Sequence, residues 1–226
     1  MYQQIINELK LLLKEASAHG IDHVERVYQT AMDLAEKEGA DKETVMLAAL
    51  LHDADDYKFV GLENSKKLLN AKKIMQKVGV SQEKQEIVCD IISNMGYSNV
   101  LKGIRPHTKE GAIVSDADML DAMGAVAILR TIEYAASKRG KIFDPAVFPC
   151  SDLTVQSYQN MADGQAPAIH HFFDKLLKLK GLILTDAAKK EAVKRHNFMI
   201  CFLKEFFGEL HEELWLNYLE DYLKRL

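Results

Sequence analysis

The stretch Met46-Leu47-Ala48-Ala49-Leu50-Leu51-His52-Asp53 joins an apolar run to two adjacent side chains that can bind a metal. Polar groups at the end of a buried helix carry a desolvation cost that an apolar core avoids. A divalent metal removes that cost, because neutral imidazole and carboxylate are good ligands for Mn, Fe, Zn or Mg. The pair alone does not decide the matter, since a histidine at a helix C-terminus also suits the helix dipole.

A second ligand candidate lies upstream, in the segment His19-Gly20-Ile21-Asp22-His23. His23 stands in the first turn of a predicted helix, and Arg26 follows three residues later, where both side chains can face the same side. The spacing of the apolar residues predicts this helix over 22–38. Its apolar stripe consists of Val24, Val27, Ala31, Leu34 and Ala35.

The third candidate segment carries carboxylates. On a helix, Asp118 and Asp121 share one face with the alanines at 122 and 125. Two carboxylates on a face otherwise lined by alanine are hard to explain as solvated surface. The alternative is a capping box that starts at Ser115, although the helical pattern begins earlier in the sequence.

These candidates lie on three different predicted helices, and in this arrangement the chain resembles the HD-domain superfamily of metal-dependent phosphohydrolases, whose signature is H…HD…D. The segment from Ala117 to Ala122 is similar to the family's A-D-x-x-D-A segment. Two C-terminal stretches, 171–179 and 195–199, are similar to those of its small stand-alone bacterial branch. The resemblance covers roughly residues 15–210. It implies an all-α HD helical bundle with additional C-terminal helices, and the metal ligands His23, His52, Asp53 and Asp118.

The chain departs from the family pattern at three places. The branch usually carries an arginine where this chain has Met119, which removes a possible phosphate-binding cation. Relatives often have a histidine near the position of Asn94 and Met95. They also often space the two early histidines differently, so the role of His19 is undecided. These departures affect the expected substrate contacts and leave the four expected ligands intact.

The resemblance implies one divalent metal ion (Mn, Fe, Mg, Ni or Zn). Two histidines and two aspartates leave open coordination positions, which a catalytic site needs for water and substrate. The expected reaction is hydrolysis of a phosphate ester or anhydride by metal-activated water. The expected substrate is a nucleotide or a small phosphorylated metabolite.

Three further residues are predicted to act in catalysis. Asp56 could accept a proton from the nucleophilic water, and Lys58 could bind phosphate. Arg26 could reach the substrate phosphate or hold Asp53, with a surface ion pair as the alternative. Asp55 is read either as a catalytic carboxylate or as part of a polar turn. Asp121 is read either as a residue that orients a ligand or as a surface carboxylate.

Two rival functions stay open. Some HD-fold proteins are di-iron oxygenases, which commonly need a histidine pair between the HD motif and the final aspartate. His107 is the only histidine between Asp53 and Asp118, which argues for a single metal; an exposed loop position is the expected place for His107. The second rival is a non-catalytic regulatory module that binds a metal or nucleotide, because Met119 leaves turnover in question.

The composition is that of an ordinary globular protein, with 48% hydrophobic and 27% charged residues. The net charge is −4 and the lysine and arginine residues are scattered along the sequence, so we expect no nucleic-acid partner. No apolar run reaches transmembrane length and no signal peptide is recognisable, so we expect a cytoplasmic protein without a membrane partner. The three widely spaced cysteines are expected to be reduced thiols. An aromatic stripe, read as core or as the face of a possible homodimer, consists of Phe198, Phe202, Phe206 and Phe207.

Helical periodicity predicts an all-α protein, and the resemblance implies a single HD-type domain over 1–226. We expect the metal-binding core over about 15–138 and a C-terminal helical extension over about 151–226. Glycine and proline place loops at 95–107 and 139–167. The predicted helices are 2–16, 22–38, 41–53, 63–78, 81–94, 108–138, 151–160, 168–180, 185–208 and 211–225.

Overall fold

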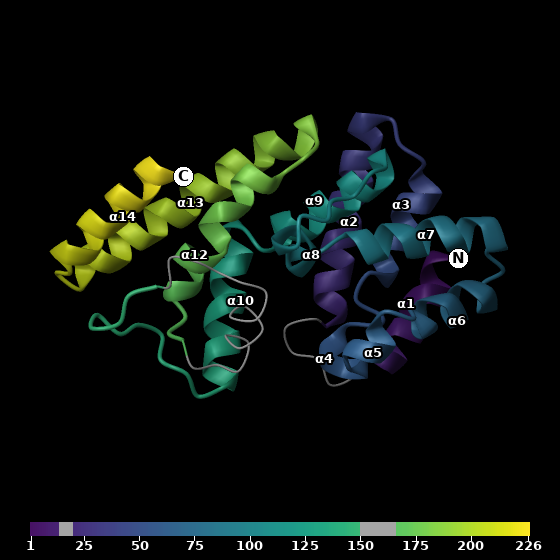
Figure 1. Cartoon of the computed structure of the whole chain (residues 1–226), viewed down its shortest axis with the longest axis horizontal. Coiled ribbons are helices and arrows are strands. Elements are labelled where there is room, and N and C mark those ends of the chain that lie inside the picture. Colours follow the sequence, from purple (N-terminus) through teal and green to yellow (C-terminus); the bar gives the residue numbers. More distant parts are fainter. Residues whose placement is uncertain (14–19, 150–165) are drawn as a thin grey trace. The chain divides into compact units, whose positions relative to one another are not determined.

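The computed structural model describes residues 1–13, 20–149 and 166–226, with the side chains of residues 58 and 59 outside the description (Figure 1). Throughout these ranges the regular secondary structure is helical and no strand occurs, which confirms the all-α class. The residues group into two compact units, Met1–Asp118 and Met119–Leu226. A single HD-type domain over the whole chain stays a prediction.

The first unit is built around α3, which packs against α2 and α7. Its N-terminus is capped by Asp41, whose side chain accepts hydrogen bonds from the backbone N–H of Glu43 and from Thr44 Oγ1. Most of α3 is fully buried, in keeping with its apolar run. The helices of this unit are α1 (Tyr2–Leu12), α2 (Ile21–Glu38), α3 (Lys42–Leu51), α4 (Tyr57–Val60), α5 (Leu62–Ser65), α6 (Leu69–Lys77), α7 (Gln82–Asn94), α8 (Tyr97–Leu101) and α9 (Lys109–Asp121), which ends in the second unit.

The second unit contains an aromatic core around Trp215. The indole is fully buried, stacks on Phe148 and donates a hydrogen bond to the carbonyl of Pro145 at 3.2 Å. The α13 helix packs against α10 and α14 (Figure 1). The helices are α10 (Gly124–Ser137), α12 (His170–Asp174), the 3₁₀ helix η1 (Leu176–Leu182), α13 (Asp186–Glu209) and α14 (Glu213–Arg225). In the predicted aromatic stripe, Phe207 is buried, Phe202 and Phe206 make ring contacts, and Phe198 is exposed.

The prediction of one continuous helix over 108–138 is wrong. The α9 helix ends at Asp121 and α10 begins at Gly124, with Met123 in an extended conformation between them. Gly124 has a φ of 81°, which an L side chain rarely adopts. The apolar periodicity continues through this break, so the pattern alone could not reveal it.

Three other predicted boundaries also differ. The helix predicted over 63–78 is divided into α5 and α6, because Leu68 adopts a left-handed conformation. The helix predicted over 168–180 is a short α-helix followed by a 3₁₀ helix, and the predicted loop at 95–107 contains α8. The helix predicted over 151–160 lies outside the described residues, as does His19. In the described ranges, no helix is both long and apolar enough to cross a membrane.

Candidate metal centre

The His52-Asp53 pair lies in a turn directly after α3. This turn is tied to α6 by Asp55, whose buried carboxylate accepts hydrogen bonds from the backbone N–H groups of Asn70 at 3.0 Å and Ala71 at 2.9 Å. The first N–H groups of a helix have no partner within the helix, so a carboxylate there stabilises it. Asp55 is therefore part of a polar turn, which is one of its two predicted roles. Its hydrogen bonds fix the turn that contains His52 and Asp53.

The backbone orients the imidazole of His52. Its Nδ1 lies 2.8 Å from the carbonyl oxygen of Ala49, one turn earlier in α3. A carbonyl accepts but cannot donate, so Nδ1 carries the proton and, in the neutral ring, Nε2 presents a lone pair. A bond of this kind is the usual way in which a protein fixes the tautomer of a histidine that binds a metal.

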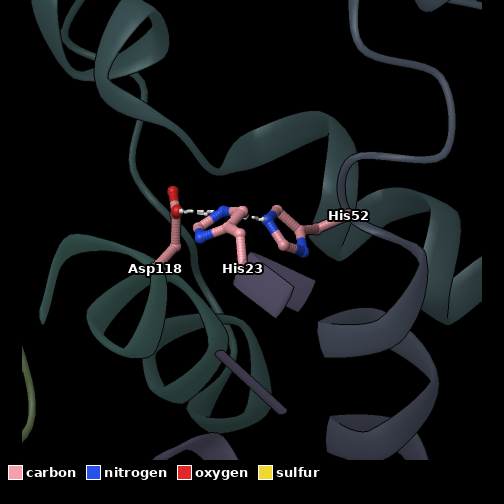
Figure 2. A group of neighbouring side chains, drawn as sticks. All are labelled: His23, His52 and Asp118. Atoms are coloured by element: carbon pink, nitrogen blue, oxygen red, sulfur yellow. Dashed lines mark hydrogen bonds and ion pairs between the residues drawn. The ribbon is translucent and has the colours of Figure 1, made fainter. Parts of the chain in front are cut away.

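The imidazole of His52 faces two side chains from other helices, His23 and Asp118 (Figure 2). His23 comes from the first turn of α2, and its Nε2 lies 3.2 Å from the Nε2 of His52. Asp118 comes from the last turn of α9, and its Oδ1 lies 3.5 Å from His23 Nε2 and 3.9 Å from His52 Nε2. The potential ligand atoms of these three residues all lie within 4.8 Å of one another.

Asp53 belongs to the same cluster. Its Oδ2 lies 3.5 Å from the Nε2 atoms of both His23 and His52. Neighbouring ligands of an ion with bonds of about 2.1 Å lie roughly 3.0 Å apart in an octahedron and roughly 3.4 Å apart in a tetrahedron. The observed spacings are close to these values, so Asp53 lies at ligand distance from both histidines, whereas the group whose ligand atoms are all within 4.8 Å of one another consists of His23, His52 and Asp118.

The chemistry of the four donors fits a divalent cation. The side chains of both histidines are 4% exposed, so their facing nitrogens are close together in a space with little water. Burial raises the pKa of Asp118, but the hydrogen bond with His23 and the electrostatic interactions with His52 and His23 outweigh it and lower the pKa overall. The carboxylate is therefore available in the ionised form that metal binding requires. The cluster indicates metal binding.

Solvent can reach the cluster from the side of Asp118. Its side chain is 28% exposed, compared with 12% for Asp53. Asp118 is therefore the more accessible of the two carboxylates, and a catalytic metal site needs such access for water and substrate.

The structure gives less detail for the three residues predicted to act in catalysis than for the four predicted metal ligands. Arg26 lies on α2 one turn after His23 and is half-buried. Asp56 ends the turn that contains the His52-Asp53 pair, and its backbone N–H donates to the carbonyl of Asp53 at 3.2 Å. Lys58 lies in α4, and its side chain is outside the description. Their catalytic roles stay predictions. Met119, which stands where the family branch usually has an arginine, is buried.

Other charged residues near the motifs have structural partners. Asp121 is buried and pairs with Arg130 Nη1 at 2.6 Å, so it is not a surface carboxylate, and its role in orienting a ligand stays a prediction. His107 is exposed and lies 3.1 Å from Asp90, as expected for a loop histidine. Arg195 donates to the carbonyl of Leu120. The sequence contains no local signal for the partners of Arg130 and Arg195, because each contact depends on the break after α9.

Comparisons with known proteins place these residues in a family. The family model for the HD domain matches residues 20–123. The chain is also 36% identical to YpgQ of Bacillus subtilis over 198 residues, or 86% of each protein. The chain belongs to the HD-domain family. The stretch matched by the HD-domain model includes all four predicted ligands.

Several solved structures have the same fold as this chain. A Lactobacillus plantarum protein is 33% identical, with a TM-score of 0.78 over 93% of this chain and 96% of the other. An HD-superfamily hydrolase from Bacillus thuringiensis is 34% identical, with a TM-score of 0.71 over the same shares. YpgQ in complex with ADP is 29% identical, with a TM-score of 0.66 over 92% of this chain and 97% of YpgQ. These similarities support a metal-dependent hydrolase.

Proposed function

We propose that this HD-domain protein is a phosphohydrolase that cleaves a phosphate ester or anhydride of a nucleotide or a small phosphorylated metabolite. The observation that carries the proposal is the convergence of His23, His52 and Asp118, with Asp53 3.5 Å from both histidines and with Asp118 accessible to solvent. The complex of the relative YpgQ with ADP supports a nucleotide as the substrate class.

The four donors would hold one divalent ion, chosen among Mn, Fe, Mg, Ni and Zn by supply in the cell. Such an ion lowers the pKa of a bound water and neutralises charge on a phosphoryl oxygen. The protein contributes the orientation of the ligands, through the bond from His52 Nδ1 to Ala49. Asp56 is proposed to accept the proton of the attacking water, while Lys58 and Arg26 are proposed to bind the phosphate.

The geometry favours one metal over a di-iron oxygenase. An additional pair of histidine ligands between Asp53 and Asp118 would be needed, and His107 is the only histidine in that stretch of sequence. The side chain of His107 is 62% exposed and lies beside Asp90 on α7. We therefore propose a mononuclear site.

The test begins with the metal content of the purified protein, together with phosphate release from a panel of nucleoside di- and triphosphates with and without Mn²⁺. We expect about one metal per chain and metal-dependent release from at least one nucleotide. Metal without turnover on any phosphorylated compound would contradict the hydrolase and favour a regulatory module. No metal after loading with any of the five ions would contradict the ligand set.

Substitutions at the HD pair test the ligand assignment. His52→Ala or Asp53→Ala is expected to abolish both metal retention and turnover, because each removes one of four donors from a cluster held by the fold. His107→Ala is the matched control, since it removes an exposed histidine and should leave the metal content intact. Retention of one equivalent of metal by Asp53→Ala would overturn the assignment of Asp53.

A further inference from the structure

The C-terminal half of α9 places negative charge where a helix tolerates it least. Asp116, Asp118 and Asp121 all lie in this half, and Asp116 and Asp121 are buried. The C-terminal end of a helix carries a partial negative charge, so carboxylates there are unfavourable. The last carbonyl groups of a helix also lack partners within it. The helix that carries the predicted ligand Asp118 therefore needs support at that end.

An arginine from α13 supplies part of that support. Arg195 Nη1 donates a hydrogen bond of 2.7 Å to the carbonyl of Leu120, in the last turn of α9. Glu191, one turn earlier in α13, accepts a bond of 2.8 Å from Arg195 Nε and so fixes the guanidinium. The aliphatic stem of Arg195 runs past Gly124, where an added Cβ would lie only 3.1 Å from Arg195 Cγ. The glycine after α9 thus makes room for this arginine.

A second arginine, from α10, supplies the rest. Arg130 Nη1 lies 2.6 Å from Asp121 Oδ2 and 3.4 Å from the Asp121 carbonyl oxygen. The Asp121 side chain is 5% exposed and that of Arg130 is 22% exposed, so this pair is largely shielded from water. Cations and guanidinium donors at a helix C-terminus satisfy the free carbonyls and oppose the dipole.

We propose that Arg195 and Arg130 are positioning residues for the metal ligand Asp118. The last turn of α9 comprises residues 118–121, so Asp118 belongs to the turn that the two guanidinium groups hold. If this turn frays, the carboxylate of Asp118 leaves its position 3.5 Å from His23 Nε2. Neither arginine is assigned a contact with the metal or the substrate. The inference rests on the metal site proposed above and adds the residues that set its affinity.

The experiment measures Mn²⁺ binding to the metal-free full-length protein by titration calorimetry. Arg195→Met is expected to weaken Mn²⁺ binding by about 10-fold or more, the range typical for residues that support a metal ligand. Arg195→Lys should recover part of the loss, because an ammonium group can still donate to the carbonyl of Leu120. Lys194→Met is the matched control: Lys194 is the preceding residue on α13, is 80% exposed, and lies beside the same Glu191. It should bind Mn²⁺ as the wild type does.

A double-substitution cycle separates positioning from a general effect on the protein. If Arg195 acts through Asp118, the residual Mn²⁺ affinity of Asp118→Asn, titrated at higher Mn²⁺ concentrations, should change little when Arg195→Met is added. Arg130→Gln is the second, independent variant, since its amide can still donate to Asp121 while the positive charge is removed. It should also weaken binding, and circular dichroism checks that each variant is folded.

The outcomes of this test are distinct. Wild-type affinity in both Arg195→Met and Arg130→Gln would overturn the positioning role, as would an equal loss in the presence and absence of the Asp118 carboxylate. Loss of folded structure in both variants would assign the arginines to stability alone and would also overturn it. If the wild-type protein itself binds no Mn²⁺, the proposed metal site fails, and this inference fails with it.

Discussion

At the residue scale, a carboxylate next to a metal-binding pair need not take part in the chemistry. Asp55 lies two residues after Asp53, yet its two oxygens accept from the backbone of α6. A carboxylate in this position stabilises a helix N-terminus in the way that an N-cap residue does. The same contacts fix the end of the turn in which His52 and Asp53 are presented.

We predict that Asp55→Ala lowers the free energy of unfolding by about 1–2 kcal/mol, because a buried and a partly buried N–H group lose their acceptor. Urea denaturation followed by circular dichroism measures the effect. Glu63→Ala removes a carboxylate that is 85% exposed and serves as the control, with little expected change. Loss of phosphate release by Asp55→Ala at unchanged stability would instead reveal a catalytic carboxylate.

His196 gives the stability of the protein a pH dependence. Burial, together with the positive charge of Lys180, lowers the pKa of His196 to about 4. An unfolded histidine has a pKa of about 6.5. Between these values the unfolded chain binds a proton that the folded chain does not, so stability falls as the pH decreases from about 6.5 to about 4.

We therefore predict that His196→Gln reduces the slope of stability against pH in this window. The wild type should lose roughly 2–3 kcal/mol across it from this residue alone. The measurement is a series of urea denaturations at fixed pH values between 4 and 7. His211→Asn, at an exposed left-handed position that suits asparagine, is the control and should keep the wild-type slope. An unchanged slope in His196→Gln would contradict the prediction.

At the element scale, helix ends with a local signal were predictable and breaks without one were not. The predictions of 22–38 and 81–94 lie within one residue of α2 and α7, because Gly39 and Ser81 mark these ends by their own chemistry. The break after α9 has a glycine as its only local sign, and a glycine within an apolar pattern is compatible with a helix. The contacts of Arg195 explain the break, and they exist only in the folded chain.

Gly124 tests this explanation. Gly124→Ala places a Cβ both in a left-handed backbone conformation and 3.1 Å from Arg195 Cγ. Gly39→Ala is the control, since Gly39 has a φ of 63° but no atom within 4 Å of the added Cβ. We expect about 1–2 kcal/mol of destabilisation from the backbone in both variants. Gly124→Ala should lose more, and equal losses in urea denaturation would contradict the contact with Arg195.

At the scale of the whole molecule, the sequence contains candidates for the metal ligands but no sign of the residues that support them. The cost of imidazole and carboxylate groups beside apolar helix faces marks the segments as candidates, and the resemblance to the H…HD…D signature selects His23, His52, Asp53 and Asp118 within them. Their convergence depends on how α2, α3 and α9 pack, which periodicity does not specify. The partners of Asp55 and Asp121 likewise come from other helices, so their roles could not be assigned from sequence neighbours.

Because the donors come from three helices, the metal should bind the folded state in preference to the unfolded chain. We predict that Mn²⁺ at about 100 times its dissociation constant stabilises the fold by about 2.7 kcal/mol. For a protein of this size this raises the melting temperature by about 5–10 °C. Differential scanning calorimetry measures the shift, which should be retained in His107→Ala and largely lost in Asp118→Asn. An equal shift in Asp118→Asn would remove Asp118 from the ligand set.

The division between the two units falls directly after Asp118. Protein synthesis proceeds from the N-terminus, so all four predicted donors leave the ribosome before Arg130 and Arg195 do. A nascent chain at that point has its complete donor set, but the end of α9 has neither guanidinium group. With the role proposed for the arginines, the growing chain could bind the metal as soon as the four donors are made. It would reach its full affinity for the metal only after α13 has been synthesised.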